Sequence, residues 1–170
     1  NVIGTAVASN SAGLTVTGLD STYDTYAILL SDLLPVTNLV QMEFRVGDSG
    51  GVDSGASDYK WSYGKNRADN TAWGVAGSTG SDHYQIGNND TGNVAGEGAG
   101  GIIWLHRPGD GQIQPTMSSH TTSVWGDGPS QFTISGGMRA SVITLDRVYF
   151  QFSSGNIVSG RMTVYGVAHA

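Results

Sequence analysis

The acidic side chains are the first residues in this chain whose type suits catalysis. A pair of carboxylates can hydrolyse a glycosidic bond, one as an acid and the other as a base or nucleophile. Only two of the fourteen acidic residues are glutamates, Glu43 and Glu97, and most of the aspartates stand beside glycine or serine. Asp in that setting usually accepts backbone hydrogen bonds in a turn. The pattern therefore favours turns over a catalytic pair.

A nucleophilic serine is the second route to catalysis, and it requires a base and an orienting acid. Serine is abundant in the predicted turns, but no Gly-x-Ser-x-Gly elbow stands before a predicted helix. The chain has no cysteine, which excludes a thiol nucleophile and a disulfide framework. We therefore expect a protein that is not an enzyme.

Metal binding is the third kind of chemistry to consider. The segment 47–58 holds Asp48, Asp53 and Asp58 among glycines, and Ca²⁺ prefers oxygen ligands of this type. The spacing matches no EF-hand, so a solvated loop is favoured and a structural calcium ion is the alternative. The four histidines form no i, i+2 or i, i+4 pair; they are His83, His106, His120 and His169. We expect no cofactor and no metal site.

Aromatic side chains gather in the central, glycine-rich half of the chain: Trp61, Tyr63, Trp73, Tyr84, Trp104 and Trp125. An exposed ring can stack on a sugar while nearby polar groups bind the sugar hydroxyls, but rings can also fill a core. Tyr63 and Trp104 stand in alternating segments, which favours the core. For Trp73 and Trp125, which have glycine and polar neighbours, surface and core remain equally open.

The candidate ligand-binding residues are Trp73, Asn88, Asn89 and Asp90. They belong to the central loops predicted at 47–58, 66–80 and 87–101. Recognition residues concentrate on loops, where glycine permits close approach and Asn and Asp supply adaptable hydrogen bonds. We expect binding there, and packing of these loops against a neighbouring subunit is the equal alternative.

The framework that positions these side chains is predicted to consist of strands. Glycine contributes 26 residues, and turns rich in Gly, Ser, Asn and Asp separate short apolar segments. Segment 38–46 shows the period of two that is typical of a strand, with Gln41, Glu43 and Arg45 on its polar face. Many short strands with such turns predict one all-β domain over residues 1–170, an antiparallel β-sandwich of the jelly-roll type.

Further strands are predicted at 14–16, 25–31, 58–63, 83–86, 101–107, 113–122, 131–135, 140–152 and 157–167. The last two are expected to pair as a C-terminal hairpin. Segment 31–38 leaves room for a short helical turn before Pro35. The side chains predicted to face the core are Val40, Met42, Phe44, Val148, Phe150, Phe152, Met162 and Val164.

Charge narrows the classes of partner. The formal net charge is −6, and the eight basic residues are scattered along the chain. A phosphate backbone requires a basic stripe, so nucleic-acid binding is disfavoured. No apolar run approaches the ~20 residues of a membrane span, so membrane insertion is not expected.

Three strings resemble a domain of bacteriophage virion surface proteins, found in fibre-like and head-decoration-like proteins. They are GLDSTYDTYAILLSDLLPVT at 18–37, RVGDSGGVDSGASDYKW at 45–61 and VYFQFSSGNIVSGRMTVYGV at 148–167. The resemblance implies a β-sandwich at the virion surface and carries no catalytic residues. The resemblance does not distinguish tail from head, and our first hypothesis is a structural protein in a tail fibre or related appendage that contributes to host attachment.

Two alternatives to host attachment stay open. The first is a head-decoration, or cement, protein that stabilises a capsid. Both virion roles predict contacts with other virion proteins and a symmetric homo-oligomer such as a trimer, and attachment adds a host cell-surface glycan as partner. The second alternative is a secreted carbohydrate-binding module, which predicts a monomer with an aromatic platform on one sheet face.

Overall fold

The computed structural model describes residues 1–88, 90–106, 111–126 and 128–168, so Asn89 and His169 lie outside the described residues. This part of the chain contains strands and no helix. The strands are β1 (Val2–Val7), β2 (Leu14–Thr17), β3 (Thr25–Pro35), β4 (Met42–Asp48), β5 (Gly51–Val52), β6 (Tyr59–Arg67), β7 (Gly74–Ser81), β8 (Tyr84–Gln85), β9 (Gly98–His106), β10 (Thr116–Val124), β11 (Ser130–Arg139), β12 (Arg147–Phe152) and β13 (Ile157–Val167).

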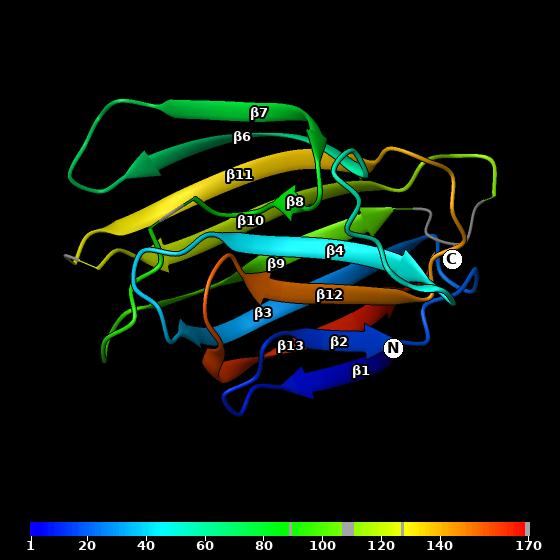
Figure 1. Cartoon of the computed structure of the whole chain (residues 1–170), viewed down its shortest axis with the longest axis horizontal. Helices are drawn as coiled ribbons and strands as arrows, with labels where there is room; N and C mark the ends of the chain where they lie inside the picture. Colours follow the sequence, from blue (N-terminus) through cyan, green and yellow to red (C-terminus); the bar gives the residue numbers. More distant parts are fainter. Residues whose placement is uncertain (89, 107–110, 127, 169–170) are drawn as a thin grey trace.

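The strands form two antiparallel sheets that pack as the layers of a sandwich (Figure 1). The larger sheet has eight strands in the order β1-β13-β3-β9-β10-β11-β6-β7. The smaller sheet has five, in the order β2-β12-β4-β5 with β8 also paired to β4. The predicted all-β antiparallel sandwich is confirmed, and this strand order is compatible with a jelly-roll.

The core lies between the two sheets and confirms the predicted inward faces. Side chains from β4 and β12 of the smaller sheet meet those from β13 of the larger one, and all eight predicted core residues are buried. Phe150 is fully buried and meets Phe152 edge-on, with ring centroids 5.2 Å apart. Period-two alternation was enough to predict these faces because each segment buries only one side in the core.

The C-terminal hairpin prediction is wrong. β12 pairs with β2 and β4 in the smaller sheet, whereas β13 pairs with β1 and β3 in the larger one. The turn after Phe152 therefore carries the chain from one layer to the other, and Gly155 in that turn has a φ of 71°. Both strands still point their apolar sides into the same core, which is why their alternation looks like that of paired strands.

The helical turn expected between Ser31 and Asn38 is also wrong. β3 continues to Pro35, and its pairing with β9 shifts register between Leu30 and Leu33. Asp32 has a φ of 56° at this irregularity. A bulge inserts an unpaired residue into a strand and interrupts the simple alternation, so the sequence pattern breaks there without leaving the sheet.

Three strands were not predicted: β1, β5 and β7. β1 and β7 form the two edges of the larger sheet. β7 consists mainly of Gly, Ser, Thr and Ala, and most of it is exposed. An edge strand can remain polar and short of large side chains because only one of its sides pairs with a neighbour, so it lacks the apolar signal used to recognise strands.

The predicted central loop at 87–101 is only partly exposed, with residues 94–96 at the surface. Gly87, Asp90, Thr91 and Gly92 are buried, and the last four residues of the range begin β9. Thr91 forms a bridge with Val40, and the Gly92 amide donates to the carbonyl of Val124 at 2.9 Å. The segment after β8 thus packs against the strands instead of standing away from them.

Candidate functional site

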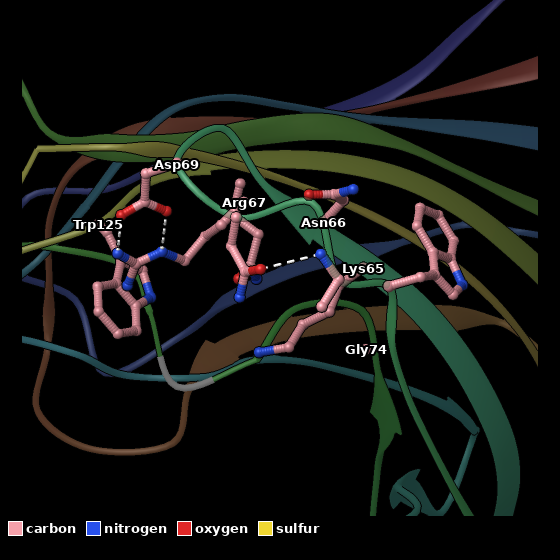
Figure 2. A pocket seen from close by; sticks show the side chains of 10 residues that line it. Lys65, Asn66, Arg67, Asp69, Gly74 and Trp125 are labelled. Atoms are coloured by element: carbon pink, nitrogen blue, oxygen red, sulfur yellow. Dashed lines mark hydrogen bonds and ion pairs between the residues drawn. The ribbon is translucent and has the colours of Figure 1, made fainter.

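The β6–β7 hairpin carries a hollow of about 520 Å³ at one edge of the larger sheet (Figure 2). Its polar walls come from both strands, the loop between them and β11, and two tryptophans complete it. The loop is held by its own turn: the Asn70 amide donates to the Arg67 carbonyl at 3.1 Å, and the Ala72 amide donates to Asn70 Oδ1 at 2.9 Å. The main side chains of the lining are Lys65, Arg67, Asp69, Trp73, Trp125 and Gln131.

Asp69 and Trp125 both fix the orientation of Arg67. Its Nε donates to Asp69 Oδ1 at 2.7 Å, and its Nη2 pairs with Asp69 Oδ2. The guanidinium lies over the Trp125 ring, with its central carbon 3.7 Å from the ring centroid (Figure 2). The hydrogen bond from Arg67 lowers the pKa of Asp69, so the pair stays ionised at neutral pH. The planar fork of arginine suits both contacts at once.

Asp90 lies behind two side chains that line the hollow, Lys65 and Gln131, and contacts both. It is fully buried, accepts a hydrogen bond from Gln131 Nε2, and lies 3.5 Å from Lys65 Nζ. Burial raises the pKa of Asp90, while the charge of Lys65 and the hydrogen bond from Gln131 act in the opposite direction. The carboxyl therefore orients two lining side chains, and it does not itself line the hollow.

Trp73 belongs to the lining of this hollow and of a second one, of about 330 Å³, on the outward face of the sheet. Half of Trp73 is exposed, at 51%. Its ring packs against Gly64, where an added Cβ would stand 2.5 Å from the indole. Glycine is thus required at this position for the ring to lie where it does. The second hollow is lined by Ser62, Gly64, Val75, Ile134 and Gly136, among others.

The four predicted binding residues occupy different environments. Trp73 lines the hollow and Asp90 lies behind it. Asn88 accepts a hydrogen bond from the Tyr63 hydroxyl at 3.2 Å and is not part of the lining. Asn89 lies outside the described residues. Their role in binding remains a prediction.

Sequence reasoning missed the residues that make up most of the hollow. Lys65, Arg67 and Asp69 are sequence neighbours with a net charge of only +1, so they form no conspicuous basic or acidic run in the sequence. Gln131 stands in a segment predicted only as a strand. The one available signal was the alternation that continues from Tyr63 through Lys65 to Arg67, which places these three side chains on one face of β6.

Of the two aromatic side chains predicted to fill the core, one is buried and the other is not. Tyr63 is buried, as expected, and stacks on Trp61 with centroids 5.6 Å apart. The core assignment of Trp104 is wrong: its neighbours Ile103 and Leu105 face inward and are fully buried, whereas Trp104 is partly exposed on the opposite face. In β9 both faces carry apolar residues, so alternation alone does not identify the inner one.

The aspartates of segment 47–58 each have protein partners. Arg139 Nε lies 2.8 Å from Asp53 Oδ2, and its Nη2 lies 3.2 Å from Asp58 Oδ1. Asp48 Oδ1 accepts a hydrogen bond from the Gly50 amide at 2.7 Å. Across the described ranges, no group of three or more His, Asp or Glu residues is arranged to hold a metal ion. A calcium ion at this loop stays an untested alternative.

A second polar cluster lies on the outer side of β4, the face predicted to be polar. Arg45 is buried there, and its Nε donates to the Asp82 carbonyl at 2.7 Å while Nη2 contacts Asp82 Oδ2 at 2.6 Å. Glu43, also buried, accepts a hydrogen bond from Gln151 Nε2 at 2.8 Å. Burial opposes ionisation of Asp82, but hydrogen bonds from His83 and Arg45 lower its pKa. The cluster fastens the segment before β8 to the smaller sheet.

Ser49 is the serine whose neighbours come nearest to a catalytic spacing. It lies between Gly47 and Gly51 in the tight turn that joins β4 to β5. A nucleophile elbow leads from a strand into a helix, whereas this turn leads from one strand directly into another. The spacing is therefore accounted for by a hairpin.

Two further observations bear on setting and identity. Among the residues that the structure describes, no helix has the length and hydrophobicity to cross a bilayer. Comparison with known protein families, with curated proteins and with solved structures finds no match for this chain.

Proposed function

We propose that this chain is a non-enzymatic surface domain of a tailed-phage virion, part of a tail fibre or related appendage, which attaches to a glycan on the host cell. The observation that carries the binding role is the hollow of the β6–β7 hairpin. There the stacked pair of Arg67 and Trp125 stands near the half-exposed ring of Trp73.

The chemistry of the hollow suits a sugar. A ring such as Trp73 can cover the apolar face of a pyranose, while charged and amide groups bind its hydroxyls in two directions. The side chains of Lys65 and Arg67 can donate hydrogen bonds, that of Asp69 can accept them, and that of Asn70 can do both. Asp69 and Asp90 already orient the two cations, which reduces the side-chain ordering that binding has to supply.

The virion setting is supported by the three strings of resemblance, which all fall on framework strands. String 18–37 contains β3, string 45–61 leads from β4 into β6, and string 148–167 contains most of β12 and all of β13. The hollow is built mainly from residues beyond these strings. A common framework with a variable edge is the arrangement expected when one fold carries different binding specificities. In this setting the domain assembles with copies of itself, as a trimer, and with other virion proteins.

A head-decoration role is favoured by a different observation. The outward face of the larger sheet carries apolar side chains that no other strand of the described residues covers, among them Leu29 at 37% exposure and Phe132 at 42%. Ile102, Trp104 and Ile134 lie on the same face and are partly exposed. Such a face is typical of a subunit interface. A secreted carbohydrate-binding module would use the same hollow as a monomer.

Adsorption of the purified chain to host cells separates these roles. Attachment predicts that the domain binds cells and competes with whole phage, that Trp73→Ala loses binding, and that the oligomer stays intact by light scattering. Phe132→Ala serves as the control, because it removes an exposed ring outside the hollow. A Trp73→Ala protein that adsorbs normally would contradict attachment through this hollow. Loss of the oligomer in Phe132→Ala with unchanged adsorption would show that the outward face serves assembly.

A further inference from the structure

The larger sheet is almost without acidic side chains. Its eight strands, all of them among the described residues, contain a single one, that of Asp32, although the chain has fourteen and a formal net charge of −6. Asp32 lies at the irregularity near the C-terminal end of β3. A net charge of this sign makes two copies of the chain repel each other where their acidic surfaces meet. On the outward face of this sheet, two copies can meet without bringing carboxylates together.

One row of mostly apolar side chains crosses this outward face from edge to edge. Backbone pairing places its members opposite one another on successive strands: Thr5, Thr163, Leu29, Ile102, His120, Ile134, Gly64 and Val75. Leu29 and Val75 are exposed, and Ile102 and Ile134 are partly exposed. A continuous row of this kind, rimmed by polar residues, is typical of a surface that another protein covers.

The face is large enough for a stable contact between proteins. Eight strands about 4.8 Å apart, each rising about 3.3 Å per residue over about eight residues, present about 1,000 Å². A stable interface buries about 800 Å² on each partner. The area therefore suits a partner with a flat face of similar size, and the same face of a second copy meets this requirement.

The two halves of this face differ in relief. Trp104 on β9 and Gly136 on β11 both pair with Ser118 on β10, so they lie at the same level, one strand away from β10 on either side. The ring of Trp104 is partly exposed. Gly136 instead opens the smaller hollow of about 330 Å³, since an added Cβ would have no neighbour closer than 4.0 Å. A bulky ring and a depression thus flank the middle of the sheet.

We propose that this outward face joins copies of the chain, and that Trp104 of one copy enters the smaller hollow of the next. An axis along β10 produces this contact, in a pair as in a three-fold assembly, because rotation about it brings β9 of one copy towards β11 of its neighbour. The inference rests on the self-assembly proposed above, and it names the surface and the side chain that carry it. Lys65, Arg67 and Gln131 point to the opposite face of the sheet from Gly136, so the polar hollow stays open in the assembly.

Light scattering of the purified chain over a series of concentrations tests the contact. We expect the wild type to form an oligomer, and Trp104→Ala and Gly136→Val to weaken it by about tenfold or more, the effect of losing a central Trp contact. Both variants should fold, because Trp104 lies outside the core and valine at Gly136 enters open space on a strand; circular dichroism checks this.

Two matched controls change similar side chains elsewhere. Tyr149→Ala removes a partly exposed ring from the outer face of the smaller sheet, and Gly111→Val adds a side chain where nothing lies within 4 Å of the new Cβ. Both controls should assemble as the wild type does. A wild type that stays monomeric at its highest soluble concentration would overturn the proposal, and so would full assembly of folded Trp104→Ala and Gly136→Val proteins.

A mixture of the two variants tests the match between ring and hollow. Trp104→Ala keeps an open hollow and Gly136→Val keeps its ring, so a mixed assembly contains an intact contact that neither variant forms alone. We expect the mixture to associate more tightly than either variant does, and equal association would contradict the proposed contact. Glycan binding should persist in both variants, because the polar hollow lies on the other face. A wild type that forms the oligomer but binds no host glycan would overturn the attachment role and leave this contact standing.

Discussion

The guanidinium of Arg67 stacks on the ring of Trp125, at 3.7 Å from its centroid, and Asp69 holds the edge of the same guanidinium. Arg67 ends β6, whereas Trp125 follows β10, so the stack joins two strands that are not neighbours in the sheet. A cation over an indole is worth about 0.5–2 kcal/mol, depending on its exposure. The contact therefore sets the shape of the wall more than the stability of the fold.

Replacing this arginine by lysine tests the stack directly. Arg67→Lys keeps the charge but loses the planar fork that contacts Asp69 and Trp125 together. We expect glycan affinity to fall about tenfold, equivalent to about 1.4 kcal/mol, with a change in melting temperature of only a few degrees. Isothermal calorimetry and thermal melting measure the two effects. Arg161→Lys, on the exposed side of β13, is the control and should bind as the wild type does.

The packing of Trp73 on Gly64 supplies a second prediction. An alanine at this position places its Cβ 2.5 Å from the present position of the indole, so the ring must move. We expect Gly64→Ala to lower glycan affinity nearly as far as Trp73→Ala, and to shift Trp fluorescence towards the red. Gly80→Ala, on the neighbouring strand with 3.4 Å to its nearest atom, should change neither property. Normal binding by Gly64→Ala would mean that the position of this ring does not matter.

Asp90 gives a prediction about pH. Burial raises the pKa of this carboxyl in the folded state, so the native protein holds the proton more tightly than the unfolded chain does. Above the usual Asp pKa, unfolding releases that proton, and a rise in pH therefore favours unfolding through this group. The stability of the wild type relative to Asp90→Asn should fall as pH increases from about 4 towards neutrality. Urea titrations across this range measure the difference, and a difference that grows with pH would show that the sign is wrong.

Truncation of Phe150 tests which face of β12 points into the core. Phe150 is fully buried against Phe152 at the centre of the sandwich, and Phe150→Ala should cost about 3–5 kcal/mol of unfolding free energy. The same truncation at Phe132, which is 42% exposed, should cost much less as long as that face is free. Equal losses at both positions, measured by urea denaturation, would contradict the assignment of inner and outer faces.

The framework was predictable where each strand buries one face in the core. β4, β12 and β13 show this alternation, and their core residues are correct. Pairing was harder to predict, because strands on opposite sides of a core show the same pattern, as β12 and β13 do. Edge strands were the hardest, since β7 has few large side chains to alternate.

The candidate site was predictable only in part. Trp73 stood out because an aromatic ring among glycine and polar neighbours has no obvious core role. Asp90 looked like a loop residue, yet the chain folds back under β6 and β11 and buries it against Lys65 and Gln131. These contacts join residues far apart in sequence, so they cannot be predicted from local composition.

The most direct measurement of glycan binding at this hairpin uses the four indole N–H signals in a ¹⁵N–¹H correlation spectrum, one for each tryptophan. Trp73 and Trp125 line the hollow, whereas Trp104 lies on the outward face of β9. Titration with an oligosaccharide from the host cell surface should shift the Trp73 and Trp125 signals at one common dissociation constant and leave Trp104 in place. Shifts confined to Trp104, or a bound glycan that moves neither Trp73 nor Trp125, would contradict the central claim.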